Sequence, residues 1–205
     1  MPQLALALVI VWFLVLFAFR TALQWWKTGS GGVRGFSGPV GSMEWNAGLI
    51  TSLGMAAGML APVAALLGWP GGRPWFAHDP THLAGAGVVA LGIVGALAAQ
   101  VRMGDSWRIG VDASERTALV TGGLFAWVRN PIFSFLMVTA VGLLALLPNP
   151  FALASGLLTF AGIELQVRRV EEPYLRATHG EDYERYAERV GRFLPGVGRG
   201  VGRPA

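Results

Sequence analysis

The stretch Ile132–Val167, IFSFLMVTAVGLLALLPNPFALASGLLTFAGIELQV, contains a single charged residue, Glu164, and is interrupted by Leu147-Pro148-Asn149-Pro150. Two prolines around an asparagine favour a tight turn. The stretch therefore predicts two apolar helices that form a hairpin, each of about 16 to 18 residues. This length is at the short end of what crosses a bilayer, so a re-entrant hairpin is an open alternative.

Three more apolar runs precede the hairpin: Leu4–Phe19, which we expect to continue to Leu23, Ala47–Trp69 and Leu83–Val101. Each is long enough to span a membrane, provided that Arg20 extends its charge to the headgroups. Small residues at helical spacing predict close helix packing in the second and third runs; they are Gly54, Gly58, Gly85, Gly92, Ala96 and Ala99.

The predicted fold is thus an all-α polytopic membrane protein with about five transmembrane helices and a helical C-terminal tail. We expect one domain over residues 1–205, with three spans in residues 1–101 and the functional half in residues 102–205. Composition agrees, because 53% of the residues are hydrophobic, 14% are charged and the mean hydropathy is +0.51. The absence of Cys and the presence of only three His predict no disulfide and no metal site.

The distribution of basic residues predicts the orientation. Of the sixteen Lys and Arg residues, all except Arg73 lie in the first loop, the third loop or the tail. Five spans place these three segments on one side, which the positive-inside rule assigns to the cytoplasm. We therefore expect an N-terminus outside, a cytoplasmic tail, a bacterial inner membrane and no nucleic-acid partner.

Because the number of spans is odd, the third loop and the start of the tail emerge on the same side of the membrane, where they can meet. The loop ends in Thr117–Phe133, TALVTGGLFAWVRNPIF. Asn130 and Pro131 suit the N-cap and first turn of the next helix, and Arg129 suits an anchor at the headgroups. Local chemistry therefore leaves a purely structural interpretation of this motif open.

The tail begins as a continuation of the hairpin, with Glu164, Arg168, Glu171 and Glu172 on one helical face until Pro173 disfavours helix. Glu164 and Arg168 are spaced for an ordinary salt bridge. Adjacent carboxylates at a bilayer exit repel each other, so Glu171 and Glu172 predict a nearby cation or donor. The alternative is a solvated pair neutralised by nearby arginines.

A short amphipathic helix follows Gly180. Tyr183, Tyr186 and Val190 share one side of it, which predicts that it packs back against the membrane-facing part of the protein.

Together, the loop motif and the tail resemble the isoprenylcysteine carboxyl methyltransferase family and its phospholipid methyltransferase relatives. The similar segments are Leu119-Val120-Thr121-x-Gly123-x-x-Ala126-Trp127-x-Arg129-x-Pro131, Glu171-Glu172-x-x-Leu175, Gly180-x-x-Tyr183-x-x-Tyr186 and Pro195. The resemblance implies S-adenosylmethionine in a mostly enclosed cytosolic pocket, and Arg168 as the residue that orients the acceptor. It implies cofactor contacts at Thr117, Ala118, Leu119, Val120, Phe125, Arg129, Asn130, Pro131, Ile132, Phe133, Glu171 and Glu172.

The chain departs from this family at three of these positions. Asn130 stands where the family usually has His, and Phe125 and Phe133 stand where Tyr is common. Asparagine keeps a neutral donor and acceptor, and phenylalanine keeps a stacking face for adenine. Cofactor binding is therefore compatible with the sequence, whereas a mechanism that needs a histidine base at position 130 is not.

The expected function is a membrane methyltransferase for a lipophilic small molecule or lipidated substrate that enters from the bilayer. A carboxylate acceptor is favoured, because it is already ionised at neutral pH whereas an amine must lose a proton. The alternatives are a small transporter or scaffold surrounded by membrane lipids, and an NADPH-dependent lipid or sterol reductase.

Overall fold

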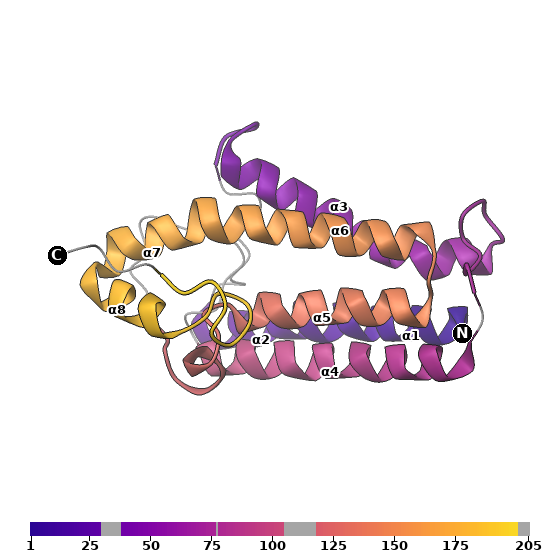
Figure 1. Ribbon diagram of the computed structural model, residues 1–205, viewed down its shortest axis with the longest axis horizontal. Coiled ribbons are helices and arrows are strands. Elements are labelled where there is room, and N and C mark those ends of the chain that lie inside the picture. Colours follow the sequence, from indigo (N-terminus) through magenta and orange to yellow (C-terminus); the bar gives the residue numbers. More distant parts are fainter. Residues whose placement is uncertain (30–37, 77, 105–117, 201–205) are drawn as a thin grey trace.

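The computed structural model describes residues 1–29, 38–76, 78–104 and 118–200. Its secondary structure is helical, and the long helices run roughly parallel or antiparallel to one another (Figure 1). One layer contains α3 (Met43–Leu66) and α6 (Pro150–Gln166), and the other contains α1 (Pro2–Phe13), α4 (Asp79–Met103) and α5 (Pro131–Leu146). This all-helical arrangement confirms the predicted fold class.

Among the helices that the structure describes, four are long and apolar enough to cross a membrane: Pro2–Thr28, Met43–Leu66, Asp79–Met103 and Pro150–His179. The predicted fourth span, α5, has only 16 residues and is not among these four. It nevertheless packs along α4, and the hairpin turn reaches the α3–α4 connection, where the Trp75 amide donates to the Pro148 carbonyl at 2.8 Å. The hairpin thus extends to the far end of the bundle.

The hairpin turn is fixed by a buried asparagine. The Asn149 Oδ1 atom accepts from the Ala152 amide, which caps α6, and its Nδ2 atom donates to the carbonyls of Ala61 and Gly72 at 3.1 and 3.0 Å. One side chain therefore ties the predicted turn to α3 and to the segment that follows it.

The first span is a continuous rod of α1, the π-helical turn η1 (Leu14–Phe19) and α2 (Arg20–Thr28). The prediction that Arg20 reaches the headgroups is wrong, because its side chain is buried. Its guanidinium donates to Gln24 Oε1 at 2.9 Å and to the Gly104 carbonyl, at the end of α4, at 2.7 Å. The Gly104 carbonyl, which has no partner within the helix because α4 ends there, thus binds the charge of Arg20 inside the protein.

Small residues bring the helices of each layer into contact, as predicted. A Cβ atom on Gly54 would lie 2.6 Å from the backbone nitrogen of Thr159, and one on Gly85 would lie 2.4 Å from that of Leu146. These distances leave no room for a side chain. The glycines therefore set how closely α3 approaches α6 and how closely α4 approaches α5.

The prediction that the helix ends before Pro173 is also wrong. The chain continues from α6 through the π-helical turn η4 (Val167–Glu171) into α7 (Glu172–His179). Pro173 stands in the first turn of α7, where a missing N–H and a fixed φ are tolerated. The resulting rod projects beyond the other helices, and α8 (Glu181–Arg189) folds back beside it (Figure 1).

A cavity of about 40 Å³ lies between the two layers. Its lining combines apolar side chains with a few hydroxyl-bearing residues and comes from α1, α3, α4, α5 and α6; among these residues are Trp12, Met55, Val89, Leu136, Thr139 and Thr159. The bundle thus contains an apolar space at the depth of its membrane-spanning helices.

Candidate active site

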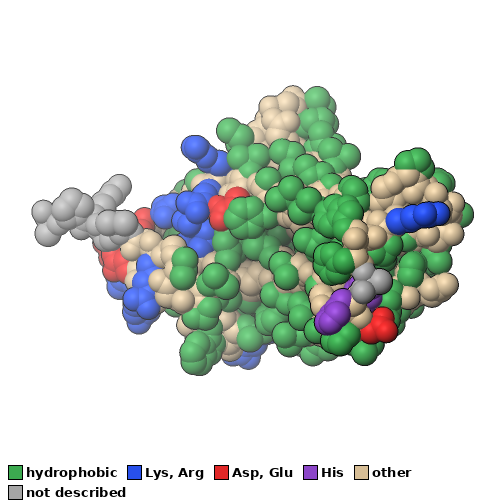
Figure 2. Space-filling model, turned by 45° about the vertical axis from the view of Figure 1, so that its right-hand side comes forward, with side chains coloured by type: hydrophobic (Ala, Val, Ile, Leu, Met, Phe, Trp, Pro, Cys, Tyr) green, Lys and Arg blue, Asp and Glu red, His purple; other side chains and the backbone are tan. Residues whose placement is uncertain are grey.

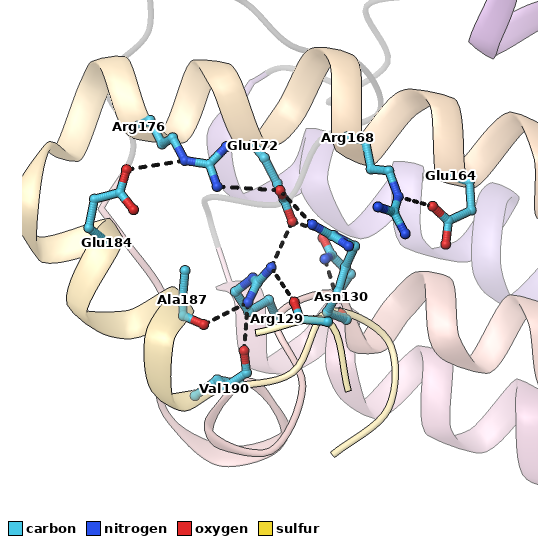
Figure 3. A network of polar contacts seen from close by, with 11 residues as sticks. Arg129, Asn130, Glu164, Arg168, Glu172, Arg176, Glu184, Ala187 and Val190 are labelled. Carbon is cyan, nitrogen blue, oxygen red and sulfur yellow. Dashed lines mark hydrogen bonds and ion pairs between the residues drawn. The ribbon is translucent and has the colours of Figure 1, made fainter. Parts of the chain in front are cut away.

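Charged side chains gather mainly at the end of the molecule where α7 and α8 lie, whereas hydrophobic side chains cover much of the remaining visible face (Figure 2). The loop before α5 and the tail meet at this end, as the parity of the spans predicts. The contacts that join them centre on Arg129 and Glu172 (Figure 3).

Arg129 is 5% exposed and its guanidinium is surrounded by acceptors. Its Nη1 atom donates to the carbonyls of Ala187 and Val190 at 2.9 and 2.6 Å. Its Nη2 atom donates to Glu172 Oε1 at 2.8 Å and to the Gly198 carbonyl at 3.1 Å. Arg129 is therefore not an anchor at the headgroups but the centre of a connection between the loop, α7 and the tail.

Glu172 is 3% exposed and is shared by three arginines. Besides Arg129, it accepts from Arg192 Nε at 2.6 Å and Arg192 Nη2 at 3.0 Å, and Arg176 Nη2 lies 3.6 Å from its Oε2. Glu172 in turn raises the pKa of Arg192, mainly through this hydrogen bond. The cation predicted next to the paired acids is thus present at Glu172, and its position excludes the solvated alternative for this residue.

Asn130 precedes α5, as predicted, but its side chain does not cap the helix. Its Nδ2 atom instead donates to the Arg192 carbonyl at 3.2 Å, and its amide donates to the same oxygen at 3.1 Å. Asn130 thus occupies the predicted N-cap position, but its side chain binds the tail and caps no amide of α5. Pro131 does occupy the first turn of α5.

The tail runs alongside the loop for several residues. The Arg129 amide donates to the Gly191 carbonyl at 2.8 Å, and Ser134 Oγ donates to the Phe193 carbonyl at 2.7 Å. Together with the Asn130 contacts, these bonds attach residues 191–193 to the start of α5.

The two tyrosines of α8 pack inward, as predicted. Tyr183 and Tyr186 are buried with Ala187 and Val190, and Leu119 of the loop packs against this cluster. The Tyr186 hydroxyl donates to the Phe125 carbonyl at 2.6 Å. Burial, followed by the negative charge of Glu172, raises the pKa of Tyr183 to about 12, and burial raises the pKa of Tyr186 still further above its usual value.

The remaining acids and bases near the corner form separate pairs. Arg168 is bonded to Glu164, which confirms the predicted salt bridge and turns Arg168 away from the Arg129–Glu172 pair (Figure 3). Glu171 is half-buried, and its Oε1 atom lies 3.4 Å from Gln166 Nε2. The two adjacent glutamates therefore have different surroundings, although sequence alone treats them alike.

The loop residues that the resemblance assigns to the cofactor differ in exposure. Ala118 is exposed, Leu119, Val120, Ile132 and Phe133 are half-buried, and Phe125 is buried beneath α8. Thr117 lies outside the described residues. Their cofactor contacts stay predictions. In the part of the chain that the structure describes, no three His, Asp or Glu side chains gather as metal ligands would.

Sequence reasoning named Arg176 among the arginines near the paired acids, but it missed Arg192 and Ser134. Arg192 is one of eight arginines after position 167, so composition gives no reason to select it. One signal could have found it. A buried carboxylate needs compensating positive charge, which predicts that an arginine of the tail folds back onto the paired acids. Which arginine does so depends on the course of residues 190–198.

Comparison with known proteins assigns the chain to a family. The sequence profile of the family described as phospholipid methyltransferase matches residues 80–182, which is half of the chain. The chain belongs to the phospholipid methyltransferase family. The match covers the third span, the loop, the hairpin, α7 and the first residues of α8, whereas Tyr186 and Arg192 lie beyond it.

Two curated relatives of this phospholipid methyltransferase family member are described as probable protein-S-isoprenylcysteine O-methyltransferases, from Oryza sativa subspecies indica and japonica. Each is 30% identical over 87 residues, which is 42% of this chain and 46% of the relative. The chain thus spans about half the length of these relatives.

A solved structure shares the fold. It is the eukaryotic intramembrane Ras methyltransferase, isoprenylcysteine carboxyl methyltransferase, which aligns with a TM-score of 0.57 at 19% identity. The alignment covers 98% of this chain and 70% of that chain. The likeness includes the N-terminal spans, which the family profile does not reach, and it establishes an integral membrane fold for the phospholipid methyltransferase family member described here.

Proposed function

We propose that this protein is an integral-membrane methyltransferase that uses S-adenosylmethionine and methylates a lipophilic acceptor, a carboxylate or lipid-like group that enters from the bilayer. The observation that carries the proposal is the closeness of the polar corner to the apolar cavity. Leu136 of α5 lines the cavity, and Asn130 directly precedes the same helix. These two positions are six residues apart, which corresponds to about 9 Å along the helix axis. The cavity of about 40 Å³ has room for only a few methylene groups, so we propose that the two layers separate when an apolar tail enters between them and its polar end reaches the corner.

Family membership and the described activities of the relatives support methyl transfer. The rice proteins and the solved structure are named for the carboxyl group of isoprenylcysteine, which combines a carboxylate with a lipid tail. The cavity supports the same combination here. We therefore propose the acceptor class, an anionic group on a hydrocarbon chain, for this protein.

The residues at the corner fit the cofactor. Asn130 and Phe133 are half-buried and offer an amide and a ring face, which suit adenine. Glu171 is a half-buried carboxylate next to the clamped Glu172, which suits a positively charged group. When bound, S-adenosylmethionine supplies an electrophilic methyl group on a sulfonium sulfur. We expect further contacts from Ala118, Leu119, Val120 and Ile132.

The chain's own contribution is alignment. The polar atoms of Arg129 and Glu172 bind each other and neighbouring protein groups, so we assign both residues a positioning role. They hold the start of α5 against η4 and thereby fix Asn130 relative to Glu171. We propose that Arg168, whose side chain is 54% exposed, orients an acceptor carboxylate by exchanging part of its contact with Glu164. Methyl transfer to an ionised carboxylate needs no proton transfer, so alignment supplies much of the acceleration.

Calorimetry with the purified protein in nanodiscs tests cofactor binding. S-adenosylmethionine should bind to the wild type, and Glu171→Gln should weaken binding about tenfold or more, because a half-buried carboxylate next to a cation contributes about 1.5 kcal/mol or more. Glu188→Gln, an exposed change on α8, serves as the matched control. Absence of binding by a folded wild type would contradict the proposal, and binding of NADPH instead would favour the reductase alternative.

Incubation of lipid extracts with methyl-labelled S-adenosylmethionine identifies the acceptor class. Label in an anionic lipid, released as methanol by mild base, supports a carboxylate acceptor. Label that is stable to base contradicts a methyl ester and indicates a different acceptor group.

The orientation is part of the proposal. We expect the N-terminus outside and the α7–α8 end in the cytoplasm of a bacterium, because the basic residues gather at the α7–α8 end. The chain has no cysteine, so single cysteines introduced at either end can be labelled in intact cells with an impermeant maleimide. Labelling at Glu188→Cys in intact cells would contradict this orientation.

A further inference from the structure

Residues 194–197 form a tight turn at the corner, and we call them the tail turn. The Arg192 amide donates to the Val197 carbonyl at 2.8 Å, and the Val197 amide donates to the Leu194 carbonyl at 3.1 Å. The side chains of Leu194 and Val197 are 61% and 60% exposed. Leu194 and Val197 are the first and last residues of the turn, with Pro195 and Gly196 between them, so the turn presents two exposed aliphatic side chains close together.

The tail turn lies at the level where the membrane helices begin. Phe193, the residue before it, accepts a hydrogen bond from Ser134 in the second turn of α5. Trp127, four residues before α5, is 68% exposed and adjoins Val128, which is bridged to Gly191. Three exposed apolar side chains therefore surround the end of an apolar helix.

Exposed tryptophans elsewhere indicate the same level. Trp25 and Trp26, at the end of the first span, are 65% and 79% exposed. Arg20, one turn earlier, is bonded to the carbonyl of Gly104 at the end of α4. Tryptophans concentrate at membrane–water interfaces, so these side chains mark where the lipid headgroups lie. Arg189 and Arg199, exposed on either side of the tail turn, would meet anionic headgroups.

We propose that the tail turn and Trp127 insert into the leaflet at this end of the bundle, and that an anionic lipid surface thereby holds the tail against the corner. The segment held in this way supplies the carbonyls of Gly191, Arg192 and Gly198 to Arg129 and Asn130. Lipid contact at Leu194 and Val197 thus stabilises the Arg129–Glu172–Arg192 cluster. This inference goes beyond the proposed function and does not depend on it.

The absence of cysteine makes a direct test possible. Leu194→Cys and Val197→Cys would carry a nitroxide label in nanodiscs, with Glu188→Cys on α8 as the aqueous control. Oxygen partitions into lipid and a nickel chelate stays in water. We expect the labels at 194 and 197 to collide mainly with oxygen and the label at 188 mainly with nickel. Labels at 194 and 197 that behave like the one at 188 would overturn the proposal.

A second measurement tests whether lipid contact holds the tail. In nanodiscs that contain phosphatidylglycerol, the exposed double change Leu194→Asn, Val197→Asn should increase the rate of tryptic cleavage between residues 189 and 199 several-fold. Phosphatidylcholine alone should have a similar effect on the wild type. The membrane does not hold the tail, and the proposal fails, if two results are found together. The double variant and the wild type are cleaved equally fast, and the wild type is cleaved equally fast with and without phosphatidylglycerol.

Discussion

Arg129 Nη2 lies 2.8 Å from Glu172 Oε1, and both side chains are buried although 43 residues separate them. The pair joins the loop before α5 to the start of α7. Arg192 completes it from the tail, so three segments depend on one carboxylate. A buried charge that loses its partner is costly, which makes this cluster the most sensitive point of the corner.

Glu172→Gln should destabilise the protein by about 3–5 kcal/mol, because Arg129 and Arg192 lose their shared counter-charge in a buried site. The measurement is thermal unfolding in nanodiscs, followed by near-ultraviolet circular dichroism. Glu181→Gln is the control, since Glu181 is 92% exposed and pairs with Arg185 at the surface. An equal, small change in both variants would show that the buried pair contributes little.

Arg129→Lys should also destabilise the protein, although the charge is kept. The guanidinium contacts Glu172 and three carbonyls with two nitrogens, whereas one ammonium group cannot reach all four acceptors. A double-mutant cycle with Glu172→Gln separates the ion pair from the carbonyl contacts. Additive effects of the two changes would mean that the residues do not act as a unit.

Gly54→Ala should separate α3 from α6 and destabilise the bundle by about 1–3 kcal/mol, because the new methyl group would meet the Thr159 backbone at 2.6 Å. Gly156→Ala, on α6, is the matched control, since a Cβ atom there has no neighbour within 4 Å. It should leave stability unchanged or raise it by up to about 1 kcal/mol. Unfolding temperatures of the two variants give the comparison.

Arg20→Met should loosen the contact between the first span and the end of α4, at a cost of about 1–3 kcal/mol, because the half-buried Gly104 carbonyl loses its donor. Lys27→Met, an exposed change near the end of α2, is the control. If both variants unfold at the wild-type temperature, the Arg20 bond does not stabilise the first span.

High pH should release the tail. Burial raises the pKa of Tyr183 to about 12 from its usual value of about 10, so its neutral form is favoured in the folded state. The stability that follows from this shift is therefore fully present below pH 10 and is lost as the pH rises from about 10 to about 12. Absorbance at 295 nm should show delayed ionisation, and Tyr183→Phe should remove one delayed group. Ionisation of all tyrosines near pH 10 would contradict the burial of α8.

Glu171 and Glu172 illustrate what could not be predicted from the sequence. Sequence predicted that the acids need a cation and that the arginine motif would meet them, and both expectations hold for Glu172. It could not separate Glu172 from Glu171, because the π-helical turn η4 changes which side chain faces Arg129. That turn depends on packing, not on the local propensity of residues 167–171.

The sequence by itself determined that the chain is a helical membrane protein, where its hairpin turns and which end carries the polar chemistry. These features follow from hydropathy, proline positions and the parity of the spans, which are local or additive properties. Only the tertiary structure decided that Arg20 is buried, that Asn130 bonds to the tail instead of capping α5, and that Arg192 rather than another arginine reaches Glu172. Each of these contacts joins residues at least 20 positions apart, and so depends on how the tail and the first span pack against the bundle.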